Sequence, residues 1–122
     1  MGESCDPADM RCPVEATLNV IGGKWKAVLV WHLLEGGVLR FGELRRLLPG
    51  ITQKMLTQQL RELEAAGVIS RTVYAEVPPR VEYAVTAHGR SLRPLLEAMH
   101  AWGLQHCLQR DDDIAMPQNF VM

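Results

Sequence analysis

Residues 47–89 constrain the fold of this chain more than any other segment. The stretch from Thr52 to Ala66 has its apolar residues at helical spacing. These residues are Leu56, Leu60 and Leu63. Two segments rich in Val, Ile, Thr and Tyr follow at 68–77 and 80–85, with Pro78-Pro79 between them. Such residues favour strands, and a proline cannot donate to a ladder, so we expect a helix followed by an antiparallel hairpin with a projecting tip.

Further helices are expected on both sides of this segment. Apolar periodicity predicts them at 13–21, 24–34, 41–48 and, after a cap at Thr86, at about 86–108. Glycine pairs and a Pro-Gly turn separate the first ones. A short helix, a turn, a second helix and a hairpin form the order of a winged helix-turn-helix. The expected fold class is therefore α+β and mostly helical, with further helices at both ends.

The length and composition limit the domain organisation. With 122 residues and 48% apolar content, the chain has enough material for one compact core. We expect one domain at 12–109, between a flexible N-terminus at 1–11 and a flexible acidic tail at 110–122. The N-terminal residues do not resemble a signal peptide, and no apolar run approaches the roughly 20 residues that cross a bilayer. A cytoplasmic location without membrane association is the resulting expectation.

The helix that begins after Thr52 carries a polar face opposite its leucines. Amides, hydroxyls and cations are the groups that touch base edges and phosphates, so this face is a candidate surface for double-stranded DNA. The candidate DNA-binding residues are Thr52, Gln53, Lys54, Thr57, Gln58 and Arg61, with Arg80 on the hairpin and with Arg40 and Lys24 nearby. The formal net charge is -1, yet the segment from Lys24 to Arg90 has ten cations and six acidic residues, a formal +4. That balance permits nucleic-acid binding without proving it. An ordinary solvated helix face is the alternative interpretation.

A wide apolar stripe follows the hairpin. Its members are Leu92, Leu95, Leu96, Met99 and Trp102. A small domain already has a core in its upstream leucines, so this stripe is expected to contact another chain. The three tryptophans of the chain are otherwise expected as core or interface aromatics.

The cysteines and histidines indicate neither a disulfide framework nor a metal site. Cys5, Cys12 and Cys107 are an odd number without CxxC spacing, and the four histidines do not share ligand spacing with acids or thiols. We expect free thiols in a reducing compartment, no metal and no cofactor.

Several motifs together resemble one known family. They are Cys12-Pro13-Val14, Gly22-Gly23-Lys24-Trp25, Arg40-Phe41-Gly42-Glu43-Leu44 and the block from Leu48 to Arg71. Over roughly 12–106 the chain resembles the HxlR-type transcriptional regulators, relatives of the MarR-type winged-helix proteins. The resemblance implies a homodimer held by the first and last helices, with Val14 and Leu18 on the first. It also implies two recognition helices in successive major grooves of a palindromic operator.

The resemblance further implies a role for Cys12. In several members of this family a cysteine at this position senses electrophiles or oxidants, so a reactive small molecule is an expected effector. A thiol near a helix N-terminus is stabilised as thiolate by the helix dipole and by Arg11, although Glu15 opposes this effect. Cys107 is a candidate partner for Cys12 of the other subunit. A packing role for Cys12 and an unpaired interface thiol at Cys107 are the alternatives.

Three other functions compete with a thiol-sensing repressor. The first is a DNA-binding regulator controlled by a non-covalent small ligand. The second is a winged-helix module that binds a protein, which would respond weakly to salt, whereas phosphate binding responds steeply. An enzyme is the least favoured, because no nucleophile-base arrangement, phosphate loop or carboxylate pair is evident.

Overall fold

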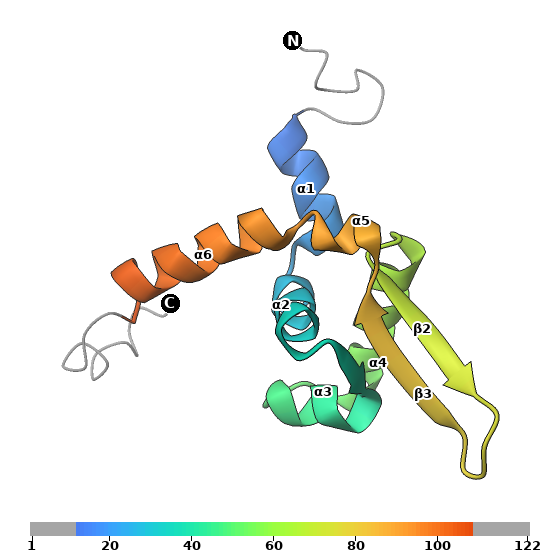
Figure 1. The fold of residues 1–122 in the computed structure, drawn as a ribbon. Coiled ribbons are helices and arrows are strands. Elements are labelled where there is room, and N and C mark those ends of the chain that lie inside the picture. Colours follow the sequence, from blue (N-terminus) through green and yellow to red (C-terminus); the bar gives the residue numbers. More distant parts are fainter. Residues whose placement is uncertain (1–11, 109–122) are drawn as a thin grey trace. The chain divides into compact units, whose positions relative to one another are not determined.

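The computed structural model describes residues 12–108, which divide into two compact units between Ser91 and Leu92. The expected flexible N-terminus, Cys5, Arg11 and the acidic tail lie outside the described residues. The first unit contains helices α1 to α5 and the sheet, and the second contains α6 (Figure 1). The elements are α1 Pro13–Ile21, α2 Lys26–Gly36, β1 Val38–Arg40, α3 Phe41–Leu47, α4 Gln53–Ala65, β2 Ile69–Tyr74, β3 Arg80–Val85, α5 Ala87–Arg90 and α6 Arg93–His106.

The first two helices begin and end where the sequence predicts, within two residues. Pro13 occupies the first turn of α1, where its missing N–H costs no hydrogen bond. α2 spans Lys26–Gly36 instead of 24–34, and Gly37 ends it with a φ of 83°, a conformation that favours glycine. Val30 and two leucines of α2, Leu29 and Leu33, are buried, while Val28 is exposed, so one broad side of the helix faces the core.

The sheet has three strands in the order β1-β3-β2. β2 and β3 form the expected hairpin, paired from Ile69 opposite Val85 to Tyr74 opposite Arg80. The strand expected at 68–77 is shorter than predicted, because pairing ends at Tyr74 and leaves 75–79 as the loop. β1 was not predicted from the sequence. Its three residues become a strand by pairing with β3, which no local pattern reveals.

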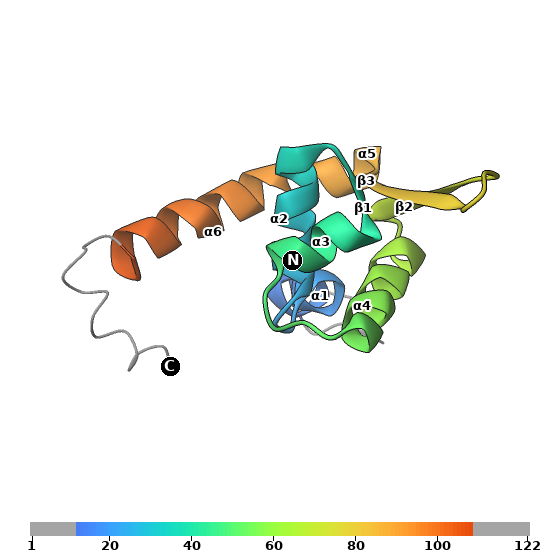
Figure 2. The same cartoon turned by 90° about the horizontal axis from the view of Figure 1, so that it is seen from below.

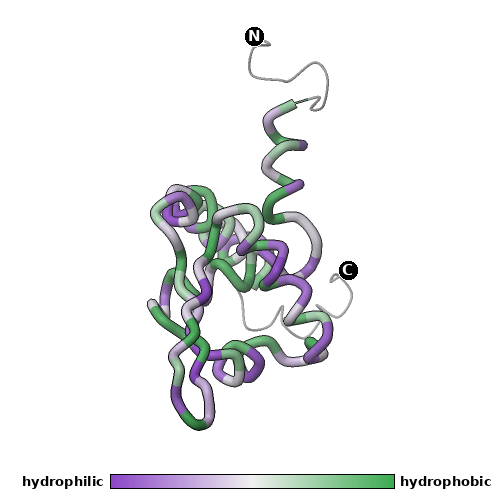
Figure 3. Tube along the Cα trace, turned by 90° about the vertical axis from the view of Figure 1, so that its right-hand side faces the viewer, coloured by the Kyte–Doolittle hydropathy of each residue, from purple (hydrophilic) through white to green (hydrophobic). Residues whose placement is uncertain are grey.

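α4 lies beside the hairpin and closes the core (Figure 2). Its leucines at helical spacing are buried, as predicted: Leu56, Leu60 and Leu63. They pack in a core with residues of α2, α3 with its C-cap Leu48, and the hairpin, which include Leu33, Leu44, Ile69 and Tyr83. The hairpin extends away from this core, and hydrophilic and hydrophobic residues both reach its far end (Figure 3).

The single helix predicted at 86–108 is wrong, because the structure has two helices there. Thr86 caps α5, as predicted, by accepting a hydrogen bond from the Gly89 N–H. Ser91 and Leu92 then form a turn, and α6 begins at Arg93 with Pro94 in its first turn. Pro94 lacks the N–H that would continue a helix from Arg90, and its ring disfavours helical geometry before it. No helix in residues 12–108 is long and apolar enough to cross a membrane.

Candidate nucleic-acid interface

α4 presents a polar face because its ends and its apolar side are fixed. The Thr52 hydroxyl caps the helix by accepting a hydrogen bond from the Met55 N–H at 3.0 Å. The buried leucines hold the opposite side against the core. The exposed side chains are Gln53, Lys54, Gln58 and Arg61, and Thr57 is half-buried. Five of the six residues predicted on this helix therefore share one accessible face, while Thr52 serves as its cap.

An ion pair ties this face to α2. Lys26 Nζ lies 2.6 Å from Glu62 Oε1, and the Lys26 side chain is 15% exposed. Hydrogen bonding to Lys26 is the main cause that lowers the pKa of Glu62. The Gln58 Nε2 donates to Glu62 Oε2 at 3.1 Å, and a carboxylate only accepts, so the amide NH₂ must face Glu62. Gln58 consequently keeps its carbonyl oxygen and its second amide hydrogen free.

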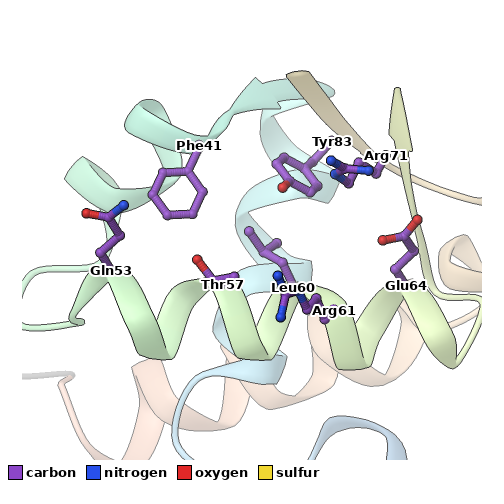
Figure 4. A pocket seen from close by; sticks show the side chains of 8 residues that line it. All are labelled: Phe41, Gln53, Thr57, Leu60, Arg61, Glu64, Arg71 and Tyr83. Carbon is purple, nitrogen blue, oxygen red and sulfur yellow. The ribbon is translucent and has the colours of Figure 1, made fainter. Parts of the chain in front are cut away.

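Two hollows meet along α4. Gln53, Thr57 and Arg61, one turn apart from each other, line both. The outer hollow, of about 520 Å³, also includes Lys54 and Gln58. We call the other, of about 420 Å³, the inner hollow; besides these three residues its lining comprises Phe41, Leu60, Glu64, Arg71 and Tyr83. In Figure 4 the rings of Phe41 and Tyr83 face α4, and Arg71 lies next to Tyr83.

The sequence did not single out the residues that close the inner hollow. Phe41, Glu64, Arg71 and Tyr83 come from four different elements. One local signal was available: Arg71 has the same strand parity as Ile69, an apolar residue expected to face inward.

Arg80 on the hairpin is held by the protein itself. Its guanidinium lies 2.8 Å from Glu76 and 2.7 Å from Glu82, and it covers the Tyr74 ring at 4.0 Å. Hydrogen bonding to Glu76 is the main cause that raises the pKa of Arg80. Two carboxylates more than neutralise this cation, so its predicted contact with DNA requires it to leave or share these partners.

Lys24 and Arg40 lie apart from both hollows. The Lys24 ammonium lies 4.8 Å from the centre of the Trp25 ring. Arg40 precedes α3, and its backbone N–H donates to the Glu43 carboxylate at 2.8 Å, which caps that helix. Neither side chain lines the inner or the outer hollow.

The two described cysteines occupy helix ends. Cys12 is half-buried, and its Sγ accepts a hydrogen bond from the Glu15 N–H at 3.4 Å, as the N-cap of α1. Cys107 is exposed and follows the last residue of α6. Both are free thiols in the described chain.

Large apolar side chains are exposed on α1 and on α6. On α1, Val14 is 68% exposed and Leu18 is 58% exposed. On α6, Leu95 and Met99 are exposed as well, and Trp102 is 61% exposed, with its ring 4.8 Å from that of His106. Two members of the predicted stripe differ, since Leu96 is buried and Leu92 is half-buried.

A helix-turn-helix followed by a hairpin, with a donor-rich exposed face on its second helix, defines the winged helix-turn-helix class of DNA-binding proteins. The chain belongs to the HxlR-like helix-turn-helix family, whose model matches residues 20–111. It is thus a transcriptional regulator with a helix-turn-helix DNA-binding fold.

Several relatives support this assignment. The uncharacterized HTH-type transcriptional regulator YybR of Bacillus subtilis (strain 168) is 58% identical over 97 residues, which are 80% of this chain and 77% of YybR. A structure of the redox regulator HypR in its oxidized form shares 55% identity and a TM-score of 0.75, over 82% of this chain and 99% of HypR. The reduced form of the transcriptional regulator YodB from B. subtilis shares 35% identity and a TM-score of 0.68, over 84% of this chain and 100% of YodB.

Proposed function

We propose that this protein represses transcription by binding a palindromic operator as a homodimer. The observation that carries the proposal is the accessible polar face of α4, which combines two cations, two amides and a hydroxyl on a fixed helix. Such a helix enters the major groove, where side chains of these types form hydrogen bonds with base edges.

The hydrogen bond from Gln58 to Glu62 determines which groups of Gln58 can contact a base. Because one amide hydrogen donates to Glu62, its carbonyl oxygen and its second amide hydrogen are the groups available to DNA. An acceptor pairs with the exocyclic amino group of adenine or cytosine in the major groove. The bidentate contact that glutamine usually makes to adenine uses the carbonyl oxygen and one amide hydrogen, so Gln58 has the groups for it while its other hydrogen stays bonded to Glu62.

The apolar surfaces of α1 and α6 support the proposed homodimer. Exposed Val14, Leu18, Met99 and Trp102 are costly to leave in water, and a second copy of the chain would cover them. A two-fold dimer places two α4 helices in successive major grooves, with half-sites about one helical turn apart.

Fluorescence anisotropy on the DNA upstream of the protein's own gene tests the DNA-binding proposal. With unrelated competitor DNA in excess, we expect specific binding at least about 1,000-fold tighter than binding to the competitor. Gln58→Ala should reduce this preference by about tenfold while binding to competitor stays unchanged, because the variant cannot bond to a base edge but keeps every phosphate-binding group. Gln105→Ala, an exposed position on α6, is the control. Equal affinity for every duplex, including selected genomic fragments, would exclude sequence-specific regulation.

We further propose that Cys12 senses oxidants or electrophiles. Cys12 is only half-buried and stands at the N-terminus of α1, where its Sγ accepts a hydrogen bond from the Glu15 N–H. Relatives described as the redox regulator HypR and as diamide-treated YodB support thiol chemistry in this family. With diamide, two thiols would lose two protons and two electrons to the reagent, which becomes the hydrazine, and form a disulfide. Cys107 of the second subunit is the proposed partner.

Cys12→Ser tests this mechanism. Diamide should change the DNA affinity of the wild-type protein by tenfold or more and leave that of Cys12→Ser unaltered, because the variant has no sulfur at position 12. Cys107→Ser is the matched comparison: it should lose the disulfide-linked dimer on a non-reducing gel but still react at Cys12. An unchanged diamide response in Cys12→Ser would refute sensing at Cys12 and favour control by another group.

A further inference from the structure

We propose that the inner hollow between α4 and the hairpin binds a phosphate of the DNA backbone, held by Arg61 and Arg71. This assignment rests on the proposed DNA binding and adds a site that the polar face of α4 alone does not include. Arg71 belongs to β2 and Arg61 to α4, and both line this hollow of about 420 Å³. Thr57 and Gln53 supply further hydrogen-bond donors along its α4 side.

Strand register places Arg71 on the side of the sheet that faces α4. Arg71 is paired with Tyr83, and directly opposed residues extend from the same face of a sheet. Ile69 and Val85, which pair two positions earlier, share that face and are both buried. Arg71 therefore lies on the same face as Ile69, but farther along the strand, where the core no longer covers the side chains. Its exposed side chain lines the inner hollow.

The charges of the hollow are available to a ligand. Within residues 12–108, neither Arg61 nor Arg71 forms an ion pair. Lys26 and Arg80, by contrast, each have carboxylate partners within 3 Å. A cation without a counter-ion among the described residues gives up no carboxylate of that part of the chain when it binds a phosphate, and guanidinium groups match phosphate geometry.

DNA geometry places a backbone strand at this position. When α4 occupies a major groove and the hairpin reaches the adjacent minor groove, the sugar-phosphate strand that separates these grooves must pass between helix and hairpin. The inner hollow is a recess between these two elements (Figure 4). Lys54 and Gln58, which line only the outer hollow, are left for the base edges.

Glu64 lines the same hollow and opposes the proposed ligand. Its carboxylate would repel a phosphate, so it limits the strength of an interaction that acts on every DNA sequence. Because the phosphate interaction is limited in strength, the difference in affinity between operator DNA and unrelated DNA stays large.

Arg71→Ala tests the site on a labelled duplex of mixed sequence, for which no operator is needed. Because one phosphate interaction is removed from each subunit of the proposed dimer, affinity in 50 mM KCl should fall at least about tenfold, and the slope of log affinity against log salt should decrease by about 1.8, which is about 0.9 per contact. Arg93→Ala removes a half-buried cation of α6, which pairs with Glu97 at 3.5 Å, and controls for net charge. Arg71→Lys should restore most of the slope, and circular dichroism with size-exclusion chromatography should show all variants folded and in the wild-type oligomeric state.

Glu64→Gln supplies a change in the opposite direction. Removing the carboxylate should strengthen binding to the same duplex by roughly threefold. If Arg71→Ala keeps the wild-type salt slope, or if it changes no more than Arg93→Ala, the phosphate site is wrong although DNA binding stands. If the wild-type protein binds neither this duplex nor genomic fragments, the proposed function is overturned together with the site.

Discussion

Replacing Gly89 by alanine is expected to lower the free energy of unfolding by about 3 kcal/mol, at the upper end of overpacking effects. A Cβ at this position would lie 2.1 Å from the Val68 carbonyl oxygen and 2.6 Å from Val85 Cγ1. Neither neighbour moves freely. The Val68 carbonyl accepts hydrogen bonds from the Thr86 backbone N–H and hydroxyl, and Val85 is paired with Ile69 in the sheet. α5 must therefore separate from the start of the hairpin.

Urea denaturation of Gly89→Ala, followed by circular dichroism at fixed protein concentration, measures this loss. Gly103→Ala is the matched control, because a Cβ there meets no atom within 4 Å. Gly103 lies inside α6, where alanine is the better helix former by about 0.5–1 kcal/mol, so this variant should be slightly more stable than wild type. If both substitutions change the free energy of unfolding by similar amounts, close packing is not the reason for glycine at position 89.

The sequence predicted those elements whose determinants are local. Leucines one turn apart located α4, and the Thr52 hydroxyl, with its short reach to the helix N–H groups, marked where it starts. The hairpin was predictable from two β-rich runs around Pro78-Pro79. The break before α6 also has a local signal in the sequence, which is Pro94. The apolar periodicity that continues through Leu92 concealed it.

Features that depend on pairing between distant residues were not predictable. β1 exists because Val38, Leu39 and Arg40 lie against β3. The inner hollow requires α3, α4 and the hairpin to meet, and no spacing along the chain shows that Arg71 and Arg61 line one recess. Charge patterns give the number of cations but not their partners.

Ion pairs within the protein determine which of its cations are available to DNA. Arg80 was predicted to contact DNA from the hairpin, yet two carboxylates hold it. Arg71, one strand away, has no ion-pair partner in residues 12–108. The positive charge that is available to DNA therefore lies in the inner hollow beside α4 and not at the hairpin tip. A net charge of -1 is compatible with this, because the local arrangement of unpaired charges governs encounter with a polyanion.

Trp102→Glu is expected to convert the proposed dimer into monomers and to weaken binding to a duplex with two half-sites by at least about 100-fold. Trp102 is the largest exposed apolar side chain on α6, and a carboxylate in an apolar interface would be buried without a partner. Each monomer would then bind its half-site alone and lose the effective concentration that the second α4 provides in a dimer.

Light scattering coupled to size-exclusion chromatography measures the mass, and anisotropy on duplexes with one or two half-sites measures the affinity. Ala101→Glu introduces the same charge one residue earlier, about 100° around the helix and away from the stripe of Leu95, Met99 and Trp102, so it should remain dimeric. Binding to a single half-site should be equal in both variants, because α4 is unchanged. A Trp102→Glu protein that remains dimeric and binds two half-sites like wild type would show that α6 does not join the subunits, and would move the dimer interface to another surface, with the exposed Val14 and Leu18 of α1 as the next to test.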